Sequence, residues 1–242
     1  MPSWVLEVGV LLLATFAAGF VSAVAGFGGA LLLLPIFVFA FGARDAVAVL
    51  TIVQLTSNLS RVALNRAELD RQVVKWFAIG AVPAAVLGSL LFVAAPAPVL
   101  TKTMGAFLLL AVVWLRWGPT VRSVSNHVLV GVGAASGLGS ALVGSVGPLV
   151  APFMLARGLT KGAYIGTEAA SAVVMHLTKL LVFGLAAVLT LPGIGYGIAL
   201  APASAGGTYV GKQVVDRLPT PVFAGVVQVG LVAAGVLLLV KG

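Results

Sequence analysis

Long apolar runs constrain the fold of this chain more than any other feature of its sequence. Segments such as LLLLPIFVFAF (31–41) and GVLLLV (235–240) carry no charged side chain, and only 8% of the 242 residues are charged. In soluble domains about a quarter of the residues are charged, whereas a hydrocarbon core of about 30 Å needs about 20 apolar residues per helical span. The runs do not alternate apolar and polar residues, as strands of a membrane β-barrel would. We therefore predict an all-α polytopic membrane protein embedded in the lipid bilayer.

The composition also excludes several classes of site and partner. The chain has no cysteine, which rules out disulfides, thiolate metal sites and cysteine nucleophiles. The formal net charge of +8 is explained by basic loops that set membrane orientation, so we predict no nucleic-acid partner. No GxxxxGK[ST] motif occurs, which argues against direct ATP drive, and no cofactor is expected. The apolar segment from Val5 onward has no basic region before it, so we expect a first helix and not a cleaved signal peptide.

Short polar or glycine-rich stretches divide the chain into ten apolar segments. Two of these segments, 28–42 and 145–158, are short for a membrane span, and each follows a glycine-rich break. We therefore predict about 8–10 transmembrane helices, with two short helices broken by glycine. The ten expected segments are 5–25, 28–42, 45–64, 73–95, 99–116, 126–142, 145–158, 161–189, 191–211 and 218–240.

The two short segments occupy matching places in a weak internal repeat, found by a shift of about 117 residues. Each half holds an odd number of spans, three or five, so the halves should cross the membrane in opposite senses. We predict two inverted-topology repeats, at 1–120 and 121–242, with a transporter site between the matching breaks. The matching pairs are Pro35 with Pro152, Arg44 with Lys161, GFGG (26–29) with GSVG (144–147) after deletion of one residue, and Gly19-x-x-Ser22 near Gly133-x-x-Ser136.

Basic residues in the loops orient the halves through the positive-inside rule. The stretch 61–75 carries four of them and is placed in the cytoplasm. Counting spans forward places 116–122 and 212–217 on the same side, and the uncharged link at 189–191 outside. We expect the chain to lie in the cytoplasmic (inner) membrane of the cell.

The glycine breaks predict an anion site. Unwound backbone at membrane depth is tolerated only where it is buried in protein or faces water, and the helix that follows presents free N–H groups and a positive dipole end. Candidate substrate-binding residues at the breaks are Gly26, Gly28 and Gly29 in the first half, and Ser145 and Gly147 in the second. The alternative is that these small residues only permit close helix packing.

Polar side chains follow one face of the long segment after each break, because they are three or four residues apart. Ionisable groups within a span are costly and are functional candidates by default. The residues in question are Thr51, Gln54, Asn58 and Arg61 in 45–64, and Glu168, Ser171, Met175 and Thr178 in 161–189, with His176 and Lys179 beside them.

These side chains suggest a division of roles. We expect Gln54, Asn58, Arg61, Ser171 and Lys179 to bind the substrate. The other two ionisable groups are candidate carriers of a coupled proton, since burial disfavours a charged carboxylate and imidazole changes charge near neutral pH. Alternatives are open for several of them: an arginine near a helix end can snorkel to the interface, hydroxyls can bond across helices, and a histidine can serve packing. The two ionisable groups named above as candidate proton carriers are Glu168 and His176.

The sequence resembles the TauE/SafE sulfite-exporter family, also called the toluene-sulfonate uptake family. The resemblance rests on GFGGALLLLP (26–35), AVAVLTIVQLTSN (46–58) and GSVGPLVAPFMLARGLTKGAYIGTEA (144–169). The second break of the family is usually richer in glycine than GSVGP, which carries a serine and a valine. The resemblance implies movement of sulfite, sulfonates or related organosulfur anions across the cytoplasmic membrane.

Together these features predict a secondary transporter of a small anion, not an enzyme, with its site near the midplane between the repeats. An anion channel is the first alternative, and sustained flux above transporter rates would favour it. An intramembrane enzyme is the second, although no His-Glu-x-x-His motif occurs. A scaffolding membrane protein is the third, and the polar stripes argue against it. The sequence carries no signal for the oligomeric state.

Overall fold

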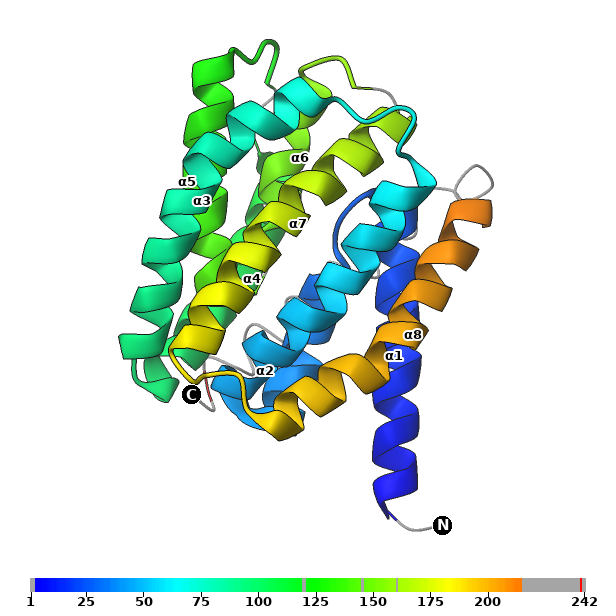
Figure 1. The fold of residues 1–242 in the computed structure, drawn as a ribbon, viewed down its shortest axis with the longest axis vertical. Coiled ribbons are helices and arrows are strands. Elements are labelled where there is room, and N and C mark those ends of the chain that lie inside the picture. The colour runs from blue at the N-terminus through cyan, green and yellow to red at the C-terminus, as the bar shows by residue number, and fades with distance from the viewer. Residues whose placement is uncertain (1–2, 119–120, 145, 160, 215–239, 241–242) are drawn as a thin grey trace.

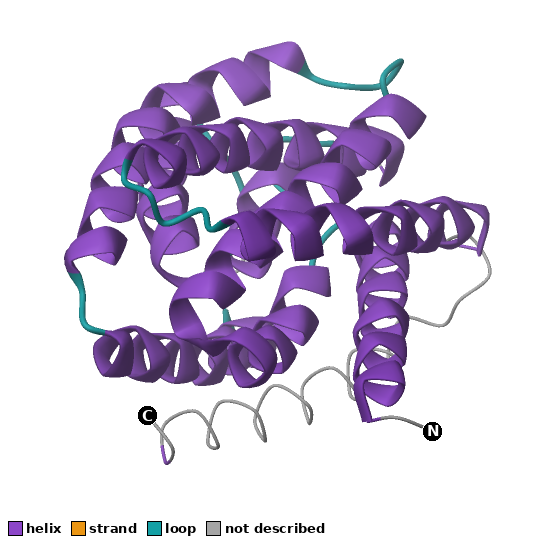
Figure 2. Ribbon diagram, turned by 60° about the horizontal axis from the view of Figure 1, so that its bottom comes forward, coloured by secondary structure: helices purple, strands orange, loops and turns teal. Residues whose placement is uncertain are grey.

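The computed structural model describes residues 3–118, 121–144, 146–159, 161–214 and 240, and this part contains helices and loops but no strand (Figures 1 and 2). Six of the helices are long and apolar enough to cross a membrane. The prediction of an all-α, multi-pass membrane protein is confirmed. The expected segment 218–240 lies outside the described residues except for Val240. The helices of the described part are α1 (Ser3–Ala25), α2 (Gly29–Leu64), α3 (Arg71–Ala94), α4 (Ala97–Trp117), α5 (Asn126–Val143), α6 (Gly147–Leu155), α7 (Lys161–Leu185) and α8 (Leu191–Val214).

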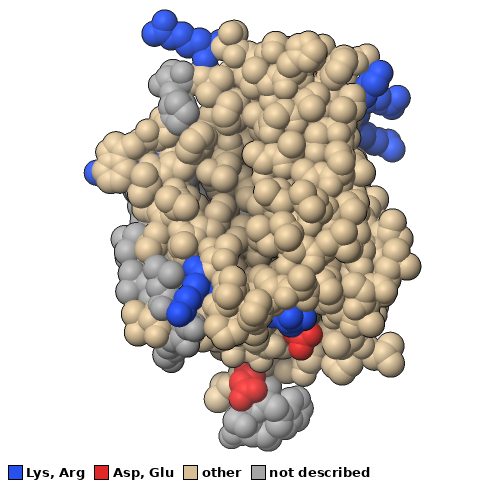
Figure 3. All heavy atoms as spheres, turned by 90° about the vertical axis from the view of Figure 1, so that its left-hand side faces the viewer, with Lys and Arg blue, Asp and Glu red and all other residues tan. Residues whose placement is uncertain are grey.

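The outside of the molecule is suited to lipid. Large apolar side chains such as Leu13 on α1, Leu90 on α3 and Leu181 on α7 are more than half exposed. Figure 3 shows a broad uncharged band across one face, with charged side chains toward the upper and lower parts of the view. Since water would disfavour such a surface and hydrocarbon would not, this band is the part of the molecule that a bilayer covers.

Helix α2 joins two segments that the sequence analysis separates, 28–42 and 45–64. A straight α-helix of 36 residues would be about 54 Å long, well beyond the hydrocarbon core of about 30 Å. The helix is kinked at Gly42, whose φ of 77° and ψ of 162° are not helical. Two helices therefore meet at this kink without a loop, and the boundary expected between 28–42 and 45–64 is present at a glycine.

The corresponding part of the second half is divided more completely. Helix α6 has nine residues, about 13 Å, and cannot cross the hydrocarbon core by itself. It has Pro148 in its first turn, where the missing N–H costs nothing. The chain then turns through Gly158, which has φ of 80°, before α7 begins. The expected segments 145–158 and 161–189 are both present but end earlier.

Two pairs of helices pack closely through small residues: α1 with α8, and α3 with α5. A Cβ atom added to Gly19 would meet the carbonyl oxygen of Ser204, and one added to Gly137 would meet that of Ala81. Successive contacts advance in the same direction along both helices of each pair, so both pairs are parallel. Each pair joins a helix from 1–120 to a helix from 121–242.

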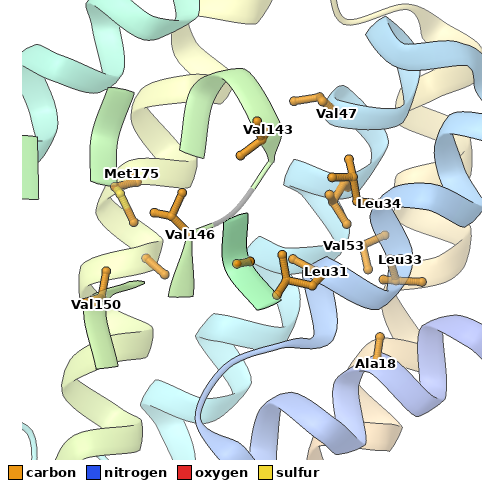
Figure 4. Packing of buried hydrophobic residues seen from close by; sticks show 14 of the residues in the cluster. Ala18, Leu31, Leu33, Leu34, Val47, Val53, Val143, Val146, Val150 and Met175 are labelled. Carbon is orange, nitrogen blue, oxygen red and sulfur yellow. The ribbon is translucent and has the colours of Figure 1, made fainter. Parts of the chain in front are cut away.

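Helices α2 and α7 cross the centre of the molecule in opposite directions (Figure 1). Arg61 of α2 lies beside Glu168 of α7, and Asn65, the residue after the end of α2, lies beside Gly166, which comes earlier in α7. Apolar residues around the two breaks pack into the same core. Figure 4 shows Val146 of the second break in this core together with residues of α2 and α7.

Candidate functional site

The glycine breaks before α2 and α6 border one small cavity between α2 and α7. The space open to the centre of a water molecule is about 10 Å³, room for roughly one water. The cavity is therefore narrow around its polar groups. Six of its ten lining residues are candidates named from the sequence. The lining residues are Ser22, Phe27, Gly28, Ala30, Gln54, Asn58, Arg61, Gly147, Glu168 and Ala172.

The first break is a turn that needs glycine. Gly26 has φ of 78° and Gly28 has φ of 98°, a region that side-chain-bearing residues rarely adopt. The N–H of Gly26 donates to the carbonyl oxygen of Ser22 at 2.9 Å and closes the last turn of α1. The N–H of Gly29, at the start of α2, donates to Ser22 Oγ at 3.2 Å. The serine therefore joins the end of one helix to the start of the next.

Arg61 connects this break to the rest of the cavity. Its Nη1 donates to the carbonyl oxygen of Gly26 at 2.6 Å and to Glu168 Oε2 at 2.8 Å, and its Nη2 donates to Asn58 Oδ1. The residue is only 3% exposed, so it points inward and does not snorkel to the interface. A guanidinium has five N–H donors, and Arg61 Nε has no partner among the described residues. The buried cation therefore retains hydrogen-bonding capacity that no atom of the described residues fills.

Glu168 supplies the acidic partner of this arginine from the other half of the chain. The Arg61–Glu168 pair is the one ion pair in the described part of the chain, and both side chains are more than nine-tenths buried. A Cβ atom added to Gly147 would lie 3.4 Å from Glu168 Oε1. The carboxylate therefore lies between the arginine and the second break, and it links α7 to α2.

The other candidates named from the sequence divide into those at the cavity and those away from it. Gln54 and Asn58 line the cavity from α2, as their spacing predicted. Ser171 is buried, but its Oγ donates to the carbonyl oxygen of Thr167 in its own helix, and it does not line the cavity. Ser145 lies outside the described residues.

Lys179 and His176 lie apart from the cavity lining. Lys179 is fully buried, and its Nζ donates to the carbonyl oxygen of Ser140 at 3.2 Å, to Ser140 Oγ at 3.0 Å and to the carbonyl oxygen of Gly144 at 2.8 Å. His176 is buried one turn earlier on α7, and its Nδ1 has no partner among the described residues. The structure therefore groups Arg61 with Glu168, and Lys179 with the end of α5.

The helices before the two breaks end in the same way. Gly144 closes α5 by donating its N–H to the carbonyl oxygen of Ser140 at 2.9 Å, as Gly26 does with Ser22 at the end of α1. These helix ends lie 118 positions apart, and at that shift Gly19-x-x-Ser22 falls on Gly137-x-x-Ser140 and Arg61 falls on Lys179.

The sequence analysis did not assign a role to several residues at the site. Phe27, Ala30 and Ala172 line the cavity but are apolar, and nothing in their type signals a ligand. Tyr164 is buried with its hydroxyl group unpartnered in the described part, and its ring lies against Gly26. Ser22 belongs to the motif Gly19-x-x-Ser22, which the sequence analysis used only to mark the repeat. Its position four residues before Gly26 was the signal that could have identified it.

The donors around the cavity suit an anion. A guanidinium and side-chain amides converge where two helices begin, and such donors recognise sulfonate, phosphate or carboxylate groups. Among the described residues, no group of three or more His, Cys, Asp or Glu side chains could hold a metal ion.

Comparison with known families gives a match over nearly the whole chain. The model of the family described as "Sulfite exporter TauE/SafE" matches residues 11–238, which include both breaks and every lining residue of the cavity. No curated protein and no solved structure shows significant similarity to the chain.

Proposed function

Because the chain belongs to the TauE/SafE sulfite exporter family, a family of membrane transporters, we propose that it is a secondary transporter of small anions. The proposed substrates are sulfite, sulfonates and related organosulfur anions. One observation carries the proposal: Arg61 is buried at a small cavity between the two breaks and has an N–H donor without a partner in the described chain.

The chemistry of anion transfer explains why a buried arginine is needed. An anion that leaves water for a low-dielectric path needs compensating positive charge, and a helix N-terminus supplies only about half a unit. A guanidinium supplies a full charge and can hold two oxygens of a sulfonate in one plane. Gly28 and Gly147 allow the starts of α2 and α6 to approach the same anion, and Gln54 and Asn58 offer amide groups beside it.

Glu168 provides a route to coupling with protons. In the structure its carboxylate is paired with Arg61, the group that an anion would need. Protonation of Glu168 removes the competing negative charge, so an anion and a proton would bind together and would cross together. His176 is the second candidate for the proton, but it lies outside the cavity lining.

Transport by this site requires two access states. A cavity with room for roughly one water is too small for sulfite, so binding must widen it toward one side or the other. We propose that the halves at 1–120 and 121–242 are inverted repeats in the cytoplasmic (inner) membrane. The opposite directions of α2 and α7 and the matching breaks before α2 and α6 support this arrangement.

The test is thermal stability of the purified protein in the presence of candidate ligands. Sulfite, thiosulfate, sulfoacetate and acetate are compared with a cation control, since a ligand specific to the folded state raises the apparent melting temperature. We expect stabilisation by at least one organosulfur anion in the wild type and in Glu168→Gln. The double variant Arg61→Gln/Glu168→Gln, which removes the buried pair as a neutral unit, should lose the effect. Lys75→Gln, which removes an exposed cation from α3, is the matched control. Equal stabilisation of the double variant contradicts the proposal.

A further inference from the structure

Helices α1 and α5 end in the same way, at equivalent positions of the two halves. Gly26 and Gly144 both have positive φ, 78° and 89°, and each donates its N–H to the serine carbonyl four residues earlier at 2.9 Å. The last carbonyl groups of a helix have no partner within it and form the negative end of its dipole. Gly26 and Gly144 are both buried, so these helix ends depend largely on protein groups for hydrogen bonds.

A buried cation satisfies each of these ends. Arg61 Nη1 donates to the carbonyl oxygen of Gly26 at 2.6 Å, and Lys179 Nζ donates to that of Gly144 at 2.8 Å. Arg61 and Lys179 are related by the same 118 positions that relate Gly26 to Gly144. In each half the cation therefore comes from the long helix after the break and holds the helix before it.

The two cations differ in what else they contact. Arg61 faces Glu168 and has a donor without a partner in the described chain. Lys179 makes no ion pair among the described residues, and the position equivalent to Glu168 holds Leu50, whose side chain lies against Gly144. An ammonium group has three donors, and Lys179 Nζ has three acceptors within hydrogen-bonding distance, all on Ser140 and Gly144. These acceptors match the number of its donors.

We propose that Lys179 is a positioning residue and not an anion ligand. Its three hydrogen bonds to Ser140 and Gly144, the Lys179 clamp, fix the end of α5 against α7. The clamp thereby holds the second break, and with it Gly147, at the cavity that Arg61 shares. This inference rests on the proposed transport function, because it concerns the placement of that site. The anion and Glu168 compete for Arg61, whereas no acidic side chain of the described residues pairs with Lys179. We therefore expect the first break to be the one that rearranges during transport.

Cysteine labelling tests the clamp, because the natural chain has no cysteine. A cysteine at Val146 reports on the second break, and a cysteine at Ala30 reports on the start of α2, which follows the first break. Both native side chains are buried. We expect Lys179→Met to raise the labelling rate at Val146→Cys about tenfold or more, as loss of a charge-assisted hydrogen bond predicts, and to leave Ala30→Cys unchanged. Arg61→Gln/Glu168→Gln should raise the labelling rate at Ala30→Cys and leave the rate at Val146→Cys unchanged. Lys179→Arg, which restores a cation, should restore protection of Val146→Cys.

Two results would overturn the inference: an unchanged labelling rate at Val146→Cys in Lys179→Met, or an equal rise at both reporters, which indicates general loosening. If Lys179→Met does not fold, Ser140→Ala answers the same question by removing one acceptor of the clamp. It should raise labelling at Val146→Cys alone, and no change there contradicts the clamp. Labelling is measured without an anion, so it tests the clamp independently of the proposed function. The clamp can be contradicted while Arg61-dependent anion binding is observed, and anion binding can be absent while the clamp is supported.

Discussion

The guanidinium of Arg61 joins three parts of the molecule that are far apart in the sequence. It holds the carbonyl of Gly26 at the first break, the amide of Asn58 on its own helix and the carboxylate of Glu168 on α7. A lysine in this place would have fewer donors and no planar fork, so the residue type matters as much as the charge. Because the group is buried, its removal affects both stability and binding.

Arg61→Gln should destabilise the protein by about 3–5 kcal/mol, because it leaves the Glu168 carboxylate buried and unpaired. The second substitution, Glu168→Gln, should recover most of that loss by removing the unpaired charge. Unfolding in mixed detergent and SDS measures both variants against the wild type. A stability of Arg61→Gln equal to that of the wild type would show that the pair is not buried as described.

Glu168→Gln should remove the pH dependence of anion binding. In the wild type, affinity for methanesulfonate should rise as the pH falls, since protonation of Glu168 frees Arg61 while the sulfonate stays a monoanion. In the variant the affinity should be high and should vary little with pH. Titration of the protein with methanesulfonate at several pH values gives both curves. A pH dependence that persists unchanged in Glu168→Gln would assign the proton to another group.

At the scale of the elements, the sequence predicted a helix boundary wherever an apolar run ends at a glycine or a charged residue. It separated 28–42 from 45–64 because Gly42, Arg44 and Asp45 interrupt the run, and the two helices do meet at a kink at Gly42. The sequence analysis placed Gln54, Asn58 and Arg61 on one helix face, because a shared face depends only on the helical period. It could not distinguish Arg61 from Lys179, since the partner of each cation depends on long-range packing: Glu168 for one, Ser140 for the other.

Close packing between α3 and α5 depends on glycine at particular positions. Gly137→Ala should destabilise the protein by about 1–3 kcal/mol, because the added methyl group would meet the backbone of α3 at Ala81. Gly131→Ala, on the same helix but with open space around it, is the matched control and should be neutral or stabilising by up to about 1 kcal/mol. The same SDS unfolding assay compares them. Equal effects of the two substitutions would contradict the packing.

At the scale of the whole molecule, the two sequence halves are interlocked. The pairs α1–α8 and α3–α5 each take one helix from 1–120 and one from 121–242, and backbone contacts at glycine hold them close. Helix α8 also packs on α2, and α3 also packs on α7. The halves therefore cannot separate as two bodies. The contact between α2 and α7, which carries Arg61 and Glu168, lies between these pairs and is the place where movement can open the cavity.

Disulfide cross-links in the cysteine-free chain test which contacts move. Cysteine pairs at 23 and 211 (α1–α8) or at 88 and 141 (α3–α5) should leave sulfite uptake into proteoliposomes nearly unchanged on oxidation. A pair at 65 and 166 (α2–α7) should block uptake until a reductant is added. All three pairs lie in close contact in the structure. Each protein under reducing conditions is its own control. Full uptake with α2 and α7 cross-linked would place the movement elsewhere.

The central claim is that the anion binds to Arg61 between the two glycine breaks. The most direct measurement is an experimental structure with selenite, the selenium analogue of sulfite, located by the anomalous scattering of selenium. The account predicts selenium in a widened cavity, with its oxygens within hydrogen-bonding distance of the Arg61 guanidinium and close to Gly28 and Gly147, and with Glu168 withdrawn from the arginine. Selenite bound elsewhere, with the Arg61–Glu168 pair intact, would contradict it.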